Sequence, residues 1–244
     1  AQAIVYRSDD SGAGWTKDSS DSPGIEDFNK SVTSLAVGAD NDTVYAGTNG
    51  ERVWYRTASI PMRGDWAPMS TNVILDKVYS LCYAPTAGIL YAGTQSGVYY
   101  HDDLANPTTT DWKALTGGLT KRINVILTND GDTIRYAGTP EGFYYYNGGW
   151  KVNNTLLDAE GKKVYAIVFG PGASVYIGTD NGIWYNEDPK AENTAGQSIY
   201  AWEQRNVNLP QIHRHIRALA FHAGSRKLYA GTEGGGVFRL TVND

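Results

Sequence analysis

Basic side chains recur directly before five apolar segments of the sequence. They are Lys30, Lys77, Lys121 with Arg122, Lys162 with Lys163, and Arg214 with His215. A second polar set, mostly acidic or amide, follows a repeated threonine: Asn49, Gln95, Glu141, Asp180 and Glu233. If the fold gathers the first set at one face, its focused positive potential could receive a carboxylate, a phosphate or an acidic sugar. Anion binding is the chemistry that such a gathered basic set would provide.

The same residues have a plainer interpretation. The basic side chains could pair with Glu141, Asp180 and Glu233 and keep a solvated rim soluble, because exposed ion pairs are common and contribute little energy. Charge patterns are more often solvated faces than sites, so the pairing is favoured over anion binding.

Paired aromatic residues offer a second kind of chemistry, since sugars stack on exposed rings. The candidates are Trp54, Tyr55, Tyr99, Tyr100, Tyr144, Tyr145, Trp184 and Tyr185. Neighbouring residues of a strand face opposite sides, and aromatic rings usually fill interiors. Packing is therefore favoured over sugar binding for most of them.

Metal and nucleophile chemistry find little support. His213 and His215 lie two residues apart, but no third ligand is close in sequence. The Asp40–Asp42 and Asp130–Asp132 segments lack the frame of a calcium loop and are interpreted as hairpin turns. No phosphate-binding glycine loop and no Gly-x-Ser-x-Gly motif is present, so we expect no metal and no cofactor.

An internal repeat must position these residues. The string Tyr-Ala-Gly-Thr, or a close variant, begins at Tyr45, Tyr91, Tyr136, Tyr176 and Tyr229, at intervals of 46, 45, 40 and 53 residues. This period is typical of propeller blades, which run about 40–50 residues. The sequence therefore predicts an all-β, five-bladed β-propeller of four-stranded antiparallel blades, in one domain spanning 1–244.

Each repeat predicts the same four strands. Strand A is apolar: Val32–Val37, Val78–Tyr83, Ile123–Leu127, Val164–Phe169 and Ile216–Phe221. Strand B is the Tyr-Ala-Gly-Thr segment. Strand C is aromatic: Val53–Tyr55, Val98–Tyr100, Phe143–Tyr145, Ile183–Tyr185 and Val237–Arg239. Strand D is marked by Trp66, Trp112, Trp150 and Trp202, and no helix longer than a turn is expected.

The two ends of the chain do not match the repeat boundaries. Ile4–Arg7 and Trp15 resemble strands C and D, whereas the chain finishes on a strand C. We expect these terminal strands to close the ring, because closure removes exposed sheet edges. Which strand C completes the closing blade stays open, and a sixth blade is the lesser alternative.

The N-terminal segment Ser8-Asp9-Asp10-Ser11-Gly12-Ala13-Gly14-Trp15 fits the pattern Ser-x-Asp-x-Gly-x-x-Trp. It resembles the Asp-box of bacterial-neuraminidase-type (BNR) repeat propellers, found in sialidases, xyloglucanases, sortilin-like receptors and bacterial propellers of unknown role. The resemblance implies a structural box formed by Ser8, Asp10, Gly12 and Trp15. Its aspartate would accept backbone hydrogen bonds while its tryptophan packs between sheets.

The expected function is a non-catalytic ligand-binding or protein-interaction module. Its ligand would lie at the channel mouth formed by the D–A and B–C loops, on Lys77, Arg122, Lys163, Arg214, His215, Asn49, Gln95, Glu141, Asp180 and Glu233. The alternative is a lectin with repeated sites between blades. A sialidase-like glycoside hydrolase is less favoured, because the loops are short and no arginine triad can be matched.

Composition limits the partners. A net charge of −5 and a pI near 5.4 argue against nucleic acid. No apolar run approaches the ~18 residues of a membrane span, and no signal peptide is visible at the N-terminus. With a single cysteine, Cys82, no intrachain disulfide can form. We expect a monomer that binds a protein, peptide or glycan, with an extracytoplasmic bacterial location favoured over the cytoplasm.

Overall fold

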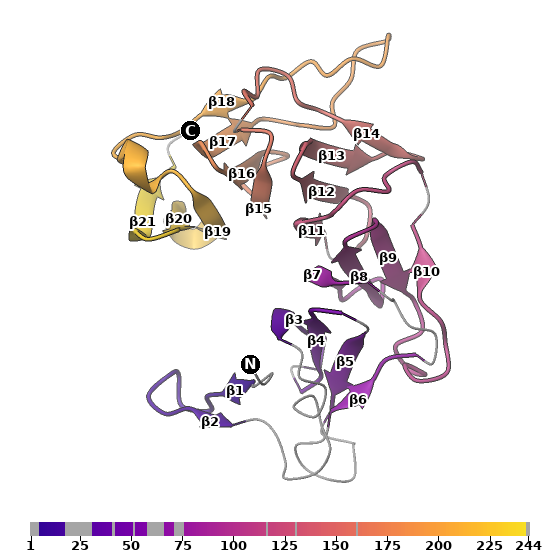
Figure 1. Ribbon diagram of the computed structural model, residues 1–244. Coiled ribbons are helices and arrows are strands. Elements are labelled where there is room, and N and C mark those ends of the chain that lie inside the picture. The colour runs from indigo at the N-terminus through magenta and orange to yellow at the C-terminus, as the bar shows by residue number, and fades with distance from the viewer. Residues whose placement is uncertain are drawn as a thin grey trace. The chain divides into compact units, whose positions relative to one another are not determined.

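The computed structural model describes residues 5–17, 31–40, 42–50, 52–57, 66–70, 76–115, 117–129, 131–159 and 161–242. Within these residues the chain forms six antiparallel sheets and no α-helix (Figure 1). Contacts divide it into two compact units. The N-terminal unit spans 1–115 and 128–133, and the C-terminal unit spans 116–127 and 134–244. The expected single domain stays a prediction.

The N-terminal unit holds a two-stranded hairpin and two four-stranded meanders. Strands β1 (Tyr6–Arg7) and β2 (Thr16–Lys17) form the hairpin. The first meander is β3 (Val32–Val37), β4 (Val44–Thr48), β5 (Val53–Arg56) and β6 (Ala67–Pro68). The second is β7 (Val78–Ala84), β8 (Ile89–Thr94), β9 (Val98–His101) and β10 (Lys113–Ala114).

Two further four-stranded meanders and a three-stranded one follow. The first is β11 (Val125–Thr128), β12 (Arg135–Thr139), β13 (Gly142–Tyr146) and β14 (Trp150–Val152). The next is β15 (Val164–Phe169), β16 (Val175–Thr179), β17 (Gly182–Asn186) and β18 (Glu203–Gln204). The last is β19 (Ile216–His222), β20 (Lys227–Thr232) and β21 (Gly236–Thr241), with single 3₁₀ turns at Gln211–His213 and Ala223–Ser225. Apart from Thr128 in β11, these strands belong to the C-terminal unit.

The repeated Tyr-Ala-Gly-Thr string has a physical reason at each position. The threonine hydroxyl donates a hydrogen bond to a carbonyl across the B–C turn, as Thr139 does to Gly142 at 3.1 Å and Thr179 to Gly182 at 3.0 Å. The glycine lets the next sheet approach. A Cβ on Gly178 would lie 2.5 Å from Cγ2 of Ile216, the first residue of the following strand A. The repeat therefore encodes both the turn and the stacking of sheet on sheet.

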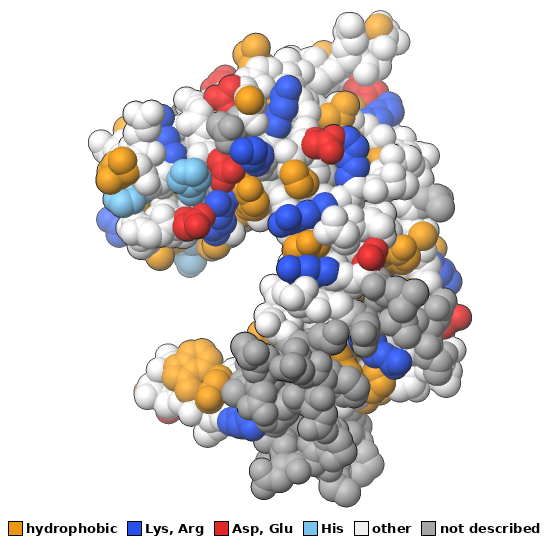
Figure 2. Space-filling view, viewed as in Figure 1, with side chains coloured by type: hydrophobic (Ala, Val, Ile, Leu, Met, Phe, Trp, Pro, Cys, Tyr) orange, Lys and Arg blue, Asp and Glu red, His pale blue; other side chains and the backbone are white. Residues whose placement is uncertain are grey.

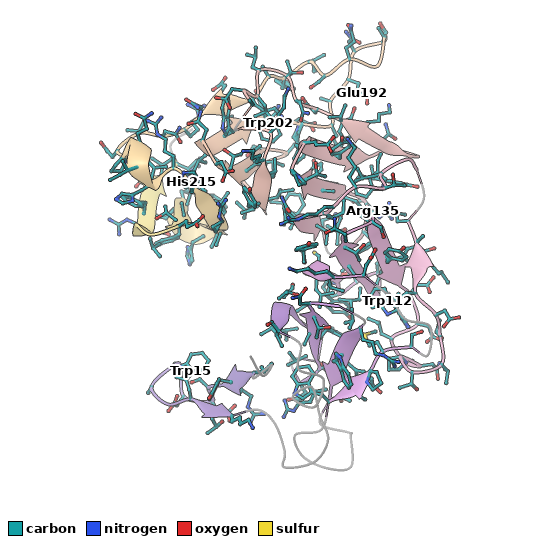
Figure 3. All side chains as sticks on the ribbon, in the orientation of Figure 1. Trp15, Trp112, Arg135, Glu192, Trp202 and His215 are labelled. Atoms are coloured by element: carbon teal, nitrogen blue, oxygen red, sulfur yellow. The ribbon has the colours of Figure 1, made fainter. Side chains whose placement is uncertain are left out.

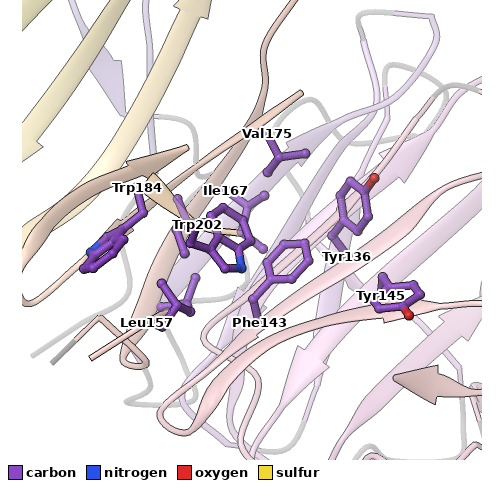
Figure 4. Close-up of a cluster of buried hydrophobic side chains, with 10 residues drawn as sticks. Tyr136, Phe143, Tyr145, Leu157, Ile167, Val175, Trp184 and Trp202 are labelled. Carbon is purple, nitrogen blue, oxygen red and sulfur yellow. The ribbon is translucent and has the colours of Figure 1, made fainter. Parts of the chain in front are cut away.

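Aromatic and aliphatic side chains fill the space between β11–β14 and β15–β18 (Figure 4). Trp202 is 1% exposed, and its ring lies edge-on to Phe143 with centroids 4.9 Å apart. The indole nitrogen of Trp202 donates to the Asn153 carbonyl at 2.9 Å. Burial of this amphipathic ring with a satisfied polar atom anchors the fourth strand to the preceding sheet.

The predicted strands A, B and C of all five repeats are present, and no end differs from the prediction by more than two residues. Trp66, Trp112 and Trp202 are buried beside short fourth strands, as expected, and Trp150 is half-buried. The last sheet has no fourth strand among the described residues. Tyr6–Arg7 and Thr16–Lys17 pair with each other, as expected for a strand C followed by a strand D.

Residues 8–14 form a tight turn with the aspartate contacts that the resemblance implies. Asp10 Oδ1 accepts hydrogen bonds from the Gly14 amide at 2.8 Å and from the Ser8 hydroxyl at 2.7 Å. The amide of Gly12 donates to Ser8 Oγ at 2.8 Å. Trp15 differs from the expectation: it is 64% exposed, since β1 and β2 form a sheet of only two strands.

Candidate ligand-binding face

Strand A begins at the same end of its sheet as the B–C turn, which we call the loop end. The Gln95 amide donates to the Lys77 carbonyl at 3.1 Å, and the Glu233 amide to the His215 carbonyl at 2.8 Å. In the β3–β6 sheet the Asn49 amide donates to the Ser31 carbonyl at 2.9 Å. Antiparallel pairing of A with B thus brings members of the two predicted sets together in the β7–β10 and β19–β21 sheets, whereas Lys30 of the first repeat lies outside the described residues. That the loop-end residues of all five repeats form a single ring stays a prediction.

In the N-terminal unit a cation–π contact and side-chain hydrogen bonds lie at the loop end of the β7–β10 sheet. The Lys77 ammonium lies 4.9 Å from the centroid of the Tyr79 ring, and the Tyr79 hydroxyl donates to Gln95 at 2.7 Å. Ser96 donates to Asp76. The Lys77 charge is therefore partly directed at an aromatic face instead of a carboxylate.

In the C-terminal unit three of the predicted cations, Lys121, Lys163 and His215, meet predicted anions. Lys121 donates to Glu141. Lys163 lies 3.7 Å from Asp180, and His215 Nδ1 lies 3.2 Å from the same carboxylate. The pairing interpretation of the sequence therefore describes these contacts better than a ring of unpaired positive charge.

Arg217 stands at the centre of this cluster. Its guanidinium donates to Asp180 at 2.8 Å and to Glu233 at 3.0 and 2.6 Å. The same group lies 4.0 Å from the centroid of the Tyr165 ring, and the Tyr165 hydroxyl donates to Asp180 at 3.2 Å. Figure 2 shows Lys and Arg side chains interspersed with Asp and Glu over the C-terminal sheets. We call Lys163, Tyr165, Asp180, His215, Arg217 and Glu233 the Arg217 cluster.

The cluster holds Asp180 ionised. Its side chain is only 10% exposed, and this burial would raise the pKa. Hydrogen bonds from Arg217 and His215 outweigh that effect, so the pKa of Asp180 lies below its ordinary value. The pKa of Tyr165 is raised by burial and by the neighbouring Asp180 charge. Tyr165 therefore acts as a neutral hydrogen-bond donor at physiological pH.

The remaining predicted residues have other surroundings. Arg214 is half-buried, and its carbonyl accepts a hydrogen bond from the Gly182 amide at 2.8 Å. Arg122 is also half-buried. His213 lies against Phe238, with ring centroids 5.8 Å apart, while His215 faces Asp180. The two histidines thus have different partners, and no group of three or more metal-ligating side chains occurs among the described residues.

Two central members of the cluster, Tyr165 and Arg217, were absent from the predicted site. A sequence signal existed: the second residue of each predicted strand A can form hydrogen bonds. These residues are Thr33, Tyr79, Asn124, Tyr165 and Arg217. Because side chains alternate along a strand, these polar residues lie on the same face of their strands.

The aromatic sugar-binding candidates are buried or half-buried. Trp54, Tyr145 and Trp184 are at most 6% exposed, and the other five are half-buried. Figure 3 shows how densely side chains fill the sheets around the labelled Trp112 and Trp202. Packing thus accounts for the three buried rings, and sugar binding at the half-buried ones stays a prediction.

No described helix is long and apolar enough to cross a membrane. No protein-family model matches the sequence, and no curated protein matches it. Among solved structures, the extracellular domain of a putative hybrid two-component system from B. thetaiotaomicron is similar over the whole of this chain, with a TM-score of 0.69 and 15% identity. A chain of the mitotic checkpoint complex is also similar over the whole chain, with a TM-score of 0.66 and 11% identity.

This chain spans 33% of the length of the first of these proteins and 75% of the second. At such identities the likeness shows the fold alone. Together with the five repeated sheets, it shows an all-β, propeller-like repeat architecture.

Proposed function

We propose that the chain is a non-catalytic interaction module that binds a protein or peptide at the loop end of its sheets. The observation that carries the proposal is the Arg217 cluster. Arg217 is 37% exposed, and Asp180, Glu233 and Tyr165 fix its guanidinium. Arginine and tyrosine are enriched among residues that dominate binding energy, and a fixed side chain loses little entropy on binding.

The charge pairing favours an interaction surface over an active site. Asp180 and Glu233 both accept from Arg217, so neither is poised as a general acid or base. The longest insertion, residues 187–201, joins β17 to β18 at the opposite end of its sheet and builds no pocket at the loop end. The similar solved structures include an extracellular domain and a component of a multiprotein complex, which agrees with an interaction role by analogy of fold alone.

We further propose a five-bladed propeller closed by its terminal strands, of the Asp-box type. Val32 begins the first strand A, in the position that Val78, Ile123, Val164 and Ile216 hold in later repeats. In a closed ring Val32 would cover Gly231, the glycine of the last Tyr-Ala-Gly-Thr string. The Asp10 turn supports the resemblance, because its carboxylate accepts the backbone and side-chain hydrogen bonds that the motif requires.

Affinity capture with matched variants tests the interaction role. Wild-type protein, the single variant Arg217→Ala and the triple variant Lys77→Glu, Arg122→Glu, Lys163→Glu are immobilised and exposed to the same protein extract. Arg135→Ala is the control, because Arg135 begins β12 at the end opposite the loop end. We expect partners that bind wild type and Arg135→Ala but are lost from both loop-end variants, with unchanged circular dichroism. Identical capture by all four proteins would contradict the proposal.

A glycan array with the same four proteins tests the lectin alternative. Acidic-glycan binding lost in the triple variant would place a lectin site at the loop end. Neutral-glycan binding that survives the triple variant would favour sites between blades. We expect neither signal, since three of the candidate aromatic rings are buried and the other five are half-buried.

A further inference from the structure

Three turns of the chain carry an asparagine followed by a glycine: Asn49-Gly50, Asn147-Gly148 and Asn181-Gly182. In such a pair the glycine amide nitrogen can attack the side-chain carbonyl carbon of the asparagine, because glycine has no side chain to crowd the approach. The reaction is intramolecular, so its rate depends on how freely the backbone brings these two atoms together. Hydrogen bonds that hold either group therefore decide which of the three turns reacts.

The Asn181-Gly182 turn is held at both reacting groups. The side-chain amide of Asn181 donates to Asp158 Oδ2 at 2.7 Å, and the Gly182 amide donates to the Arg214 carbonyl at 2.8 Å. The backbone amide of Asn181 donates to the Thr179 hydroxyl at 3.0 Å. The attack would have to break these contacts, so the structure protects this asparagine.

The Asn49-Gly50 turn is held at its nucleophile. The Gly50 amide donates to the Thr48 carbonyl at 2.9 Å, and the Asn49 amide donates to the Ser31 carbonyl at 2.9 Å. The Asn49 residue itself is exposed. Its side chain is thus accessible, but the nitrogen that would attack it is engaged in a hydrogen bond.

The Asn147-Gly148 turn is held at neither group. It joins β13 to β14, where Tyr146 pairs with Trp150 (Figure 1). The Asn147 backbone amide donates to the Gly149 carbonyl at 2.9 Å, which closes the turn without using the Gly148 amide. Within the part of the chain that the structure describes, neither the Asn147 side chain nor the Gly148 amide makes a hydrogen bond.

The space around this turn is also open. Asn147 and Gly148 are both exposed, and a Cβ built on Gly148 would meet nothing within 4 Å. Gly148 adopts a φ of 67°, in the region that favours glycine. Solvent therefore reaches both the attacking nitrogen and the amide that would leave.

We propose that Asn147 is a site of spontaneous deamidation, with water as the co-reactant. The Gly148 nitrogen bonds to Cγ of Asn147, the Cγ–Nδ2 bond breaks, and ammonia leaves with the proton that the Gly148 nitrogen gives up. The product is a succinimide ring. Water then opens the ring at one of its two carbonyl carbons, which gives aspartate or isoaspartate at position 147.

The modification changes both charge and geometry at this turn. Either product adds a negative charge to a chain whose net charge is −5. Isoaspartate also lengthens the main chain by one carbon between Tyr146 and Trp150, whose rings lie edge-on with centroids 5.4 Å apart. The turn lies at the end of β13 opposite the B–C turn, so the modification does not depend on the proposed loop-end function.

Incubation of the purified protein in mildly alkaline buffer, followed by peptide mapping with mass spectrometry, tests the proposal. In the folded protein we expect Asn147 to be converted at least tenfold faster than Asn49 or Asn181, with isoaspartate among the products. In urea-unfolded protein the three rates should be similar, because a glycine follows each asparagine and the protective hydrogen bonds are gone. Equal rates in the folded protein, or slower conversion of Asn147 than of either other asparagine, would overturn the proposal.

The variant Asn147→Gln is the matched control. It keeps the side-chain amide, but its ring would be one atom larger and closes far more slowly. The acidic species that isoelectric focusing detects in aged wild-type protein should be absent from this variant, while thermal stability and the slow conversion of Asn49 and Asn181 stay unchanged. An acidic species that forms equally fast in Asn147→Gln would overturn the assignment, whereas failure of the loop-end capture experiment would leave it intact.

Discussion

The glycine of the repeated string is the residue on which sheet stacking depends. A Cβ on Gly47, Gly138 or Gly178 would lie 2.6, 2.6 or 2.5 Å from a β-branched side chain that begins the next strand A. Real Cβ atoms do not approach this closely, so the neighbouring strand would have to move. The glycine is required by this contact.

Gly178→Ala is therefore expected to destabilise the protein by about 1–3 kcal/mol, as overpacking of a close contact does. Gly131→Ala is the control, since a Cβ there meets nothing within 4 Å and should change stability by less than ~0.5 kcal/mol or increase it slightly. Urea unfolding monitored by tryptophan fluorescence measures both. Equal urea midpoints for Gly178→Ala and Gly131→Ala would show that the sheets are not packed as described.

Asp180 is the residue whose ionisation matters most for the Arg217 cluster. Its pKa is lower in the folded protein than in the unfolded chain, so its contribution is present above the unfolded value. That contribution is lost as the pH falls through the folded pKa, because protonation then removes the charge that Arg217 and His215 contact.

Asp180→Asn should lower the free energy of unfolding by about 1–3 kcal/mol at pH 7, the range for hydrogen bonds to charged groups. The difference from wild type should shrink as the pH is lowered below ~4, where the carboxyl begins to take up a proton in the unfolded chain but still resists protonation in the folded protein. Urea unfolding at pH 7, 5 and 3.5 measures it. A difference that stays constant over this range would contradict a charged role for Asp180.

At the scale of elements, the 187–201 insertion fastens two sheets together. Asn153, 1% exposed, donates from its side-chain amide to the Pro189 carbonyl at 2.9 Å and to Ser198 Oγ at 2.7 Å. Glu192 contacts Tyr145 and Lys151 of the same sheet. The insertion, which sequence inspection marks only as long and polar, is a structural clasp in the C-terminal unit.

Asn153→Ala should lower the free energy of unfolding by about 1–3 kcal/mol, because the buried Pro189 carbonyl and Ser198 Oγ each lose the hydrogen bond that Asn153 donates. It should also expose 187–201 to limited proteolysis. Asn193→Ala provides the comparison, since the Asn193 side chain bonds only within its own turn, to Ala195 and Gln197. Equal protease resistance of wild type and Asn153→Ala would argue against the clasp.

At the scale of the whole molecule, the β3–β6 and β19–β21 sheets each have exposed apolar side chains. Leu35 and Val37 of β3 are 50% and 53% exposed, and Val237 of β21 is 73% exposed. A Cβ on Gly231 would meet only Ala218 of its own sheet, at 3.4 Å, unlike the corresponding glycines. Uncovered faces of this kind are normally buried in repeat proteins.

Ring closure predicts the behaviour of Gly231. If the first strand A covers it, Gly231→Ala should destabilise the protein by about the same 1–3 kcal/mol as Gly178→Ala. Thermal unfolding of the two variants in parallel measures this. An effect as small as that of Gly131→Ala would mean that the last sheet has no neighbour on this side.

The sequence alone determined the repeated sheets. Strand length, glycine turns and the Tyr-Ala-Gly-Thr string are local properties, so each of the five repeats predicts its own meander, and β3 and β15 begin and end at the predicted residues. The loop-end location of Asp180 and Glu233 followed from strand order within one repeat.

Only the tertiary structure decided which side chains meet between repeats. Arg217 contacts Asp180 of the preceding sheet, and Glu192 reaches Tyr145 over 47 residues of sequence. Such contacts depend on the stacking distance and the direction of long side chains across it, which no local pattern specifies.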